Sequence, residues 1–161
     1  MPGLGGRSFS EKHARESAQA LKEISPAHVR LRTCFVLEDT PLAELYQKGL
    51  FLPLTDIETI HEIKIFLEEL QGIHTEFISD HRINLLLELR GKLPQDYSKL
   101  LSIVNRFLNL SEDDKKLFII GRRLNLIRYL DELGSSEKRK LIEDKAPLYR
   151  VQIPVPRNIL Y

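Results

Sequence analysis

The sequence has a single cysteine, no long apolar run and no excess of either charge, and each absence excludes a class of protein. Cys34, the one cysteine, excludes an intrachain disulfide framework and any iron–sulfur or zinc site built from several thiolates of this chain. No apolar run approaches the roughly 20 residues that a membrane span requires, and the amino terminus lacks the apolar core of a signal peptide. We therefore expect a cytoplasmic chain that does not cross a membrane.

The charges are almost balanced. Lys and Arg together number 24 and Asp and Glu together number 23, in a chain of 161 residues. Such a chain has no strong global field, so we expect neither nucleic acid nor a membrane surface as its partner. The length suits one domain of ordinary size, and function must therefore be sought in local motifs.

A strand is predicted over residues 28–37, which read HVRLRTCFVL. Val29 and Leu31 point to one face of this strand and Arg30 and Arg32 to the other, because side chains alternate along an extended chain. Two interpretations stay open. A solvent-facing edge strand has this pattern, and so does a strand of an α/β barrel whose inward arginines bind a carboxylate or a phosphate.

A glycine-rich turn and a helix precede this strand. The turn is GLGG at residues 3–6, and Ser10 is a candidate N-cap for an amphipathic helix over 10–24. Backbone N–H groups of such a turn can face an anion or a nucleotide. Turn, helix and strand form the second half of a βαβ unit whose first strand is absent, so we expect the chain to be cut from something longer.

Two helices and a second strand are predicted after residue 37. Thr40 followed by Pro41 is typical of a helix N-terminus, and Thr55 with Glu58 three residues later fits a capping box. These signals and the apolar spacing predict helices over 41–48 and 56–71 and a strand over 73–79.

From Pro94 onward the pattern becomes helical. Apolar spacing predicts a helix over 97–108, a second one capped by Ser111, and a third over 135–144. We expect the basic pair Arg122 and Arg123 to be solvated or ion-paired. Three regions follow from this pattern: an α/β part at 1–93, a helical extension at 94–146 and an extended tail at 147–161.

A polar cluster follows the second predicted strand, where chemistry is often done in α/β proteins. It comprises Ser79, Asp80, His81 and Asn84. Asp80 and His81 suit an acid–base pair or half of a metal site, but adjacent strand residues point in opposite directions. A structural role, with Asp80 capping a turn and His81 bonded locally, is the alternative. No nucleophile or ligand spacing accompanies them, so a hydrolase is poorly supported.

Four segments in order carry a family resemblance. They are GLGG with the helix and strand that follow it, DTPLAELYQKG at 39–49, FISDHRINLLLELRGKLPQDYSKLL at 77–101 and GRRLNLIRYLDEL at 121–133. Together they resemble the carboxyl-terminal half of radical S-adenosylmethionine (radical SAM) proteins, over residues 3–133.

The resemblance implies a fold and a set of cofactor contacts. The family fold is a partial parallel (βα) barrel, so residues 1–93 would be a fragment of it, an α/β region followed by the helical carboxyl-terminal region. Arg30 and Arg32 would face the barrel lumen, and Ser79, Asp80, His81 and Asn84 would form a polar patch with a substrate-binding or structural role. Backbone contacts to S-adenosylmethionine would come from the turn, which consists of Gly3, Leu4, Gly5 and Gly6.

The resemblance also implies an incomplete enzyme. The family holds a 4Fe-4S cluster on a loop of three cysteines, whereas this chain has only Cys34, and it carries Arg7-Ser8 where relatives have an acidic residue. The cluster would then lie outside this chain, which would be inactive alone. Its partner would be the missing amino-terminal half-barrel or a second copy joined through the open sheet edge. The alternative is a non-catalytic α/β-helical module that binds a protein through 94–144 and the tail.

Overall fold

The computed structural model describes the backbone of residues 1–151 and the side chains of residues 1–147. The predicted tail beyond residue 151 lies outside the described residues. The elements, in order, are α1 (Gly6–Ile24), β1 (His28–Arg30), α2 (Pro41–Gln47), α3 (Asp56–Glu69), β2 (Thr75–Ile78), β3 (Arg90–Leu93), α4 (Tyr97–Leu108), α5 (Glu112–Arg123), the 3-10 helix η1 (Leu130–Gly134) and α6 (Ser136–Val151).

The sheet is small and mixed, in the order β1-β2-β3. β1 is parallel to β2, with Val29 opposite Phe77, but β3 runs antiparallel to β2, with Phe77 opposite Gly91. A fragment of a parallel (βα) barrel is therefore the wrong fold class, because most of the regular structure is helical and the sheet holds only one parallel pair. The reason lies in the connection from β2 to β3, which contains no helix, whereas a parallel return needs a crossover, usually helical.

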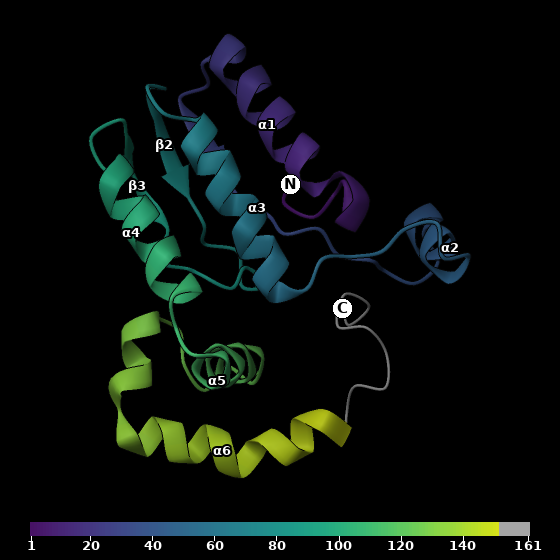
Figure 1. The fold of residues 1–161 in the computed structure, drawn as a ribbon, viewed down its shortest axis with the longest axis vertical. Coiled ribbons are helices and arrows are strands. Elements are labelled where there is room, and N and C mark those ends of the chain that lie inside the picture. The colour runs from purple at the N-terminus through teal and green to yellow at the C-terminus, as the bar shows by residue number, and fades with distance from the viewer. Residues whose placement is uncertain (152–161) are drawn as a thin grey trace.

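One face of the sheet is covered by helices and the other is exposed. Val29, Phe77 and Leu93 are buried with α1, α3 and α4, and the rings of Phe66 and Phe77 lie 6.4 Å apart. Figure 1 shows α1, α3 and α4 beside the strands, with α5 and α6 beyond them. The opposite face carries exposed or half-buried charged side chains, namely His28, Arg30, Glu76, Arg90 and Lys92.

The helix starts predicted from capping signals are confirmed for three helices. The side-chain oxygen of Thr40 accepts a hydrogen bond from the Ala43 N–H, and Ser111 accepts from the Asp114 N–H. Thr55 and Glu58 form the predicted capping box of α3. These helices begin where expected because a local side chain satisfies a backbone N–H that the helix leaves unpaired.

Two other boundaries differ from the predictions. α1 begins at Gly6 rather than at Ser10, whose hydroxyl is used by a distant carboxylate instead of capping the helix. β1 ends at Arg30 rather than near residue 37. The Leu31 N–H still donates to Ile78 of β2, but beyond it the Thr33 N–H donates to Asn84 and the Cys34 N–H to Pro2, both outside the sheet.

The carboxyl-terminal helices form a second packing layer. The rings of Phe107 on α4 and Phe118 on α5 lie 5.8 Å apart. α5 approaches α6 closely at Gly121, where a Cβ atom would lie 2.7 Å from Ile142 Cδ1. Because α6 continues to Val151, the predicted extended tail is wrong for residues 147–151.

None of the helices in the part of the chain that the structure describes is long and apolar enough to cross a bilayer.

Candidate functional site

The glycine-rich turn lies at the carboxyl end of the parallel strand pair. The Cys34 N–H, four residues after the end of β1, donates to the Pro2 carbonyl at 2.7 Å. Gly3 has a φ of +86°, and a Cβ atom there would lie 3.4 Å from the Cys34 Cβ. The turn is therefore packed directly against the segment that leaves β1.

A buried carboxylate on α3 holds the turn in place. Glu62 is 2% exposed, and its oxygens accept hydrogen bonds from the Gly3 N–H at 2.9 Å and the Ser10 hydroxyl at 2.5 Å. His13 Nδ1 lies 2.9 Å from the same carboxylate. Sequence reasoning missed Glu62, although it interrupts the apolar side of α3 between Thr59 and Phe66, where an unpartnered carboxylate would be costly.

These contacts determine which backbone N–H groups of the turn are available to a ligand. The Gly3 N–H is bound to Glu62, the Gly6 N–H donates to the Gly3 carbonyl at 3.1 Å, and the Arg7 N–H donates to the Leu52 carbonyl at 2.7 Å. Leu4 is exposed. The Leu4 N–H also donates, to the Met1 carbonyl at 3.3 Å. Contacts from the turn to a ligand would therefore come from Gly5 and the exposed Leu4 side chain rather than from the N–H groups of Gly3 and Gly6.

Arg7 stands where the resemblance implies an acidic residue, and it is already paired. Its guanidinium lies 2.9 Å from Glu58 on α3. The ion pair ties the start of α1 to the capping box of α3. Arg7 therefore has a structural role at a position where an acidic residue was expected.

Arg30 and Arg32 lie on the surface, as a solvent-facing edge strand would place them. Arg30 makes a two-point contact with Asp80, from Nε at 2.7 Å and from Nη2 at 3.0 Å. The hydrogen bond from Arg30 lowers the pKa of Asp80 below its usual value. The parallel register brings the two residues together, because Arg30 ends β1 and Asp80 follows β2.

The predicted polar patch is split by the structure. Ser79 and Asn84 are buried, and Asn84 bonds the Thr33 N–H, the Leu31 carbonyl and the Ser79 hydroxyl at 3.0, 3.0 and 3.1 Å. Asp80 lies outside this network, on the exposed side with Arg30. Asn84 thus ties the end of β1 to the loop after β2, a structural arrangement that uses all of its amide groups.

His81 does not join Asp80. Its Nδ1 atom is buried and has no hydrogen-bond partner among the described residues. Nδ1 therefore does not make the local hydrogen bond expected of His81, and the Asp80 carboxylate is taken by Arg30.

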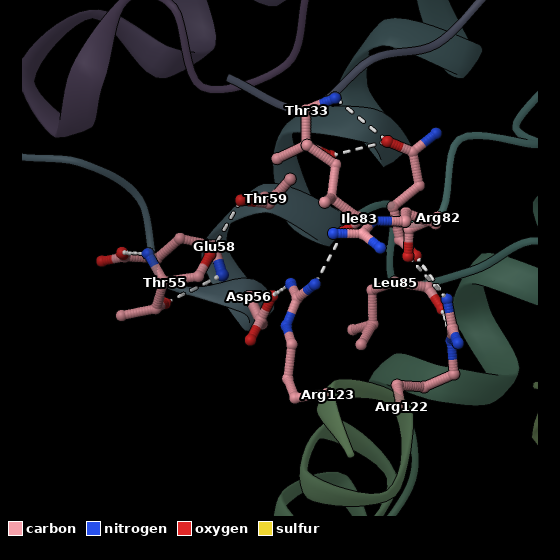
Figure 2. Close-up of polar contacts among 11 residues, drawn as sticks. Thr33, Thr55, Asp56, Glu58, Thr59, Arg82, Ile83, Leu85, Arg122 and Arg123 are labelled. Carbon is pink, nitrogen blue, oxygen red and sulfur yellow. Dashed lines mark hydrogen bonds and ion pairs between the residues drawn. The ribbon is translucent and has the colours of Figure 1, made fainter. Parts of the chain in front are cut away.

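Sequence reasoning also missed Arg122, which is 5% exposed rather than solvated. Figure 2 shows Arg122 and Arg123 reaching from α5 to the loop after β2. Arg122 donates to the carbonyls of Leu85 and Asn84, each at 2.9 Å, and more weakly to those of Arg82 and Ile127, at 3.3 and 3.4 Å. Burial, and next the charge of Arg123, lowers its pKa.

Arg123 is ion-paired, as predicted. It donates to the Ile83 carbonyl at 2.7 Å and forms a close ion pair with Asp56 at the start of α3. Together the two arginines join α5 to both the loop and α3 (Figure 2).

Cys34 is buried, as a small apolar side chain would be. Burial raises the pKa of its thiol, so little thiolate is present near neutral pH. Within the residues whose side chains are described, no group of three or more His, Cys, Asp or Glu is arranged to hold a metal ion.

Comparisons with known proteins found no match: the chain fits no protein-family model, no curated protein and no solved structure. What the site can do must therefore be argued from its own residues. They place a glycine turn, two exposed arginines and a two-point arginine–carboxylate pair at the carboxyl ends of β1 and β2, where α/β proteins bind ligands.

Proposed function

We propose that the chain is the carboxyl-terminal portion of a radical SAM protein. In this proposal it contributes residues that bind S-adenosylmethionine, while the 4Fe-4S cluster is held outside the chain. It is therefore inactive alone and works in the cytoplasm with a cluster-bearing partner. The order of the four sequence segments motivates this assignment.

The observation that carries the proposal is the contact between the GLGG turn and the segment leaving β1. The 2.7 Å hydrogen bond from Cys34 to Pro2 sets the turn at the carboxyl end of β1, beside the parallel strand β2. In open α/β sheets, cofactors bind outside the carboxyl ends of parallel strands, which is where this turn lies. Such a site does not require a closed barrel.

The exposed arginines support the same assignment. Arg30 and Arg32 lie on the side of the chain that no described helix covers, and the aminocarboxylate of S-adenosylmethionine is an anion that a guanidinium can bind at two points. Arg30 already shows such a contact with Asp80.

The free edge of β1 supports a partner of the kind proposed. Ala27 and Leu31 bond to β2, so the backbone groups of His28 and Arg30 point away from it, since alternate residues of a parallel strand face opposite neighbours. No other strand of the described chain pairs with that edge. The edge is short, but it can accept a strand of the missing half or of a second copy.

Titration of the full chain with S-adenosylmethionine tests the cofactor assignment. We expect saturable NMR shifts at the Leu4 and Gly5 amides and weaker binding in the double variant Arg30→Ala/Arg32→Ala, by about tenfold for the loss of a charge-assisted contact. Arg15→Ala, which removes an exposed arginine from α1, is the matched control and should bind as the parent does. An absence of saturable shifts would favour the protein-interaction module.

Sedimentation tests the sheet edge. We expect concentration-dependent association of the chain alone, and its loss in His28→Pro, which removes an N–H directed away from β2. His28→Ala keeps that N–H and should associate normally. A monomer at all concentrations would contradict pairing through this edge.

A further inference from the structure

A cavity of about 470 Å³ lies between α2 with the segment that follows it, the start of α3, and α5. Ile119 on α5, which is 6% exposed, forms part of its wall, and Leu52, Pro53 and Ile57 contribute further apolar surface. Tyr46 on α2 adds an aromatic ring. Small-molecule sites are typically lined by apolar and aromatic side chains and have volumes of roughly 300 to 1,000 Å³, so this cavity has the size and the lining of such a site.

The charged groups that border the cavity neutralise one another. The Arg7 guanidinium lies 2.9 Å from the Glu58 carboxylate, and Arg123 forms a close ion pair with Asp56. Figure 2 shows Arg123 reaching from α5 to Asp56 at the start of α3. A charged ligand would therefore find no unpaired counter-charge among the described lining residues and would have to compete with one of these ion pairs, whereas an uncharged ligand leaves both intact.

Contacts on two sides hold the walls of the cavity in position. The Arg7 N–H donates to the Leu52 carbonyl at 2.7 Å, which ties the segment after α2 to the start of α1. Arg123 ties α5 to α3 through Asp56, and it also donates to the Ile83 carbonyl at 2.7 Å. A ligand would enter a space that already exists, so it would not have to order the walls, and this lowers the free-energy cost of binding.

We propose that this cavity binds an uncharged, mainly apolar small molecule, which contacts Leu52, Ile119 and the ring of Tyr46. Burial of apolar surface drives the binding, because removing such surface from water is favourable. The ion pairs at the border of the cavity set the preference for an uncharged ligand. This inference does not rest on the proposed cofactor site, which lies at Gly5 and the Leu4 side chain.

NMR titration of the full chain with three ligands that share one ring system tests the proposal. The ligands are 2-naphthol, which is uncharged, the anion 2-naphthoate and the cation 2-naphthylmethylammonium. We expect 2-naphthol to give saturable shifts at the Leu52 and Ile57 amides and to bind at least about fivefold more tightly than either charged ligand. Its affinity should change less than about twofold between low salt and 0.15 M NaCl, because salt screens interactions between charges.

Leu52→Ala and Leu50→Ala form a matched pair of variants on one segment. The two leucines are 49% and 73% exposed, and of the two it is Leu52 that lines the cavity. We expect Leu52→Ala to weaken 2-naphthol binding about threefold to tenfold and Leu50→Ala to change it less than about twofold. Circular dichroism of each variant verifies the fold.

Four results would overturn the proposal. The first is an absence of saturation by 2-naphthol at about 2 mM. The second is binding of 2-naphthoate as tight as that of 2-naphthol, which would show that the arginines select the ligand. The third is an equal loss of affinity in Leu52→Ala and Leu50→Ala, which would place the binding elsewhere. The fourth is a fall in the affinity for 2-naphthol as the protein concentration rises, which would assign the cavity to a second copy of the chain.

Discussion

Two pairs of arginines, one on β1 and one on α5, show how differently the same side chain is used in this molecule. Arg30 and Arg32 alternate with apolar residues and lie in solvent, and Arg30 is held only by the exposed Asp80. Arg122 and Arg123 follow each other on a helix, yet Arg122 is buried and bonded to four carbonyls while Arg123 bridges to α3. Arg122 and Arg123, which we expected to be solvated or ion-paired, link α5 to the loop after β2 and to α3.

This difference indicates that an arginine side chain takes a structural role where backbone carbonyls outside helices and strands lack hydrogen-bond donors. The loop between β2 and β3 has no helix or ladder to satisfy its carbonyls, and Arg122 satisfies those of Arg82, Asn84 and Leu85. Around β1, by contrast, strand β2 satisfies the backbone. The exposed side chain of Arg32 therefore does not serve the backbone there, and that of Arg30 contacts Asp80.

The largest expected effect is that of Arg122→Ala. Its loss leaves several buried carbonyls without donors, so we expect the free energy of unfolding to fall by about 3 kcal/mol or more. Urea unfolding measures it. Arg106→Ala, which removes an exposed arginine from α4, is the control and should cost less than about 0.5 kcal/mol. Equal losses in the two variants would contradict a structural role specific to Arg122.

Asn84→Ala should have the next largest effect. It removes the amide that ties Thr33 and Leu31 to Ser79 within the loop that Arg122 holds, at a cost of about 2 kcal/mol. Hydrogen exchange at the Thr33 amide should accelerate as well. If exchange and unfolding match those of the parent, the link between β1 and this loop is not stabilising.

Arg123→Ala should cost less than either, about 1 kcal/mol, because its ion pair with Asp56 and its bond to Ile83 lie nearer to solvent than Arg122 does. The same urea experiment orders the three variants. A greater loss in Arg123→Ala than in Arg122→Ala would reverse the comparison between the two neighbours.

Arg30→Ala should have the smallest effect on stability, because both Arg30 and its partner Asp80 are exposed. The variant should instead raise the pKa of Asp80 toward its ordinary value, measured by NMR titration of the carboxyl carbon. A depressed pKa adds stability that is present above the ordinary value, near pH 4, and is lost as the pH falls through the folded-state pKa. An unchanged pKa in Arg30→Ala would exclude Arg30 as its cause.

Local signals in the sequence were sufficient for much of the secondary structure. Thr40, Thr55 and Ser111 marked three helix starts correctly because capping involves residues three apart in the chain. β3 was not predicted: RGKL is a strand only because β2 lies beside it. The site residues followed the same rule, since Glu62 and Arg122 act through partners roughly 40 to 60 positions away.

The sequence by itself determined the helix boundaries set by caps, the buried and exposed faces of β1, and the lack of a multi-cysteine cluster site, because each depends on residue type or short-range spacing. Only the tertiary structure decided that the sheet is mixed, that Glu62 anchors the glycine turn and that Arg122 is buried. These outcomes depend on which backbone groups and charges are left without partners once the elements pack, and distant parts of the chain must meet before that is decided.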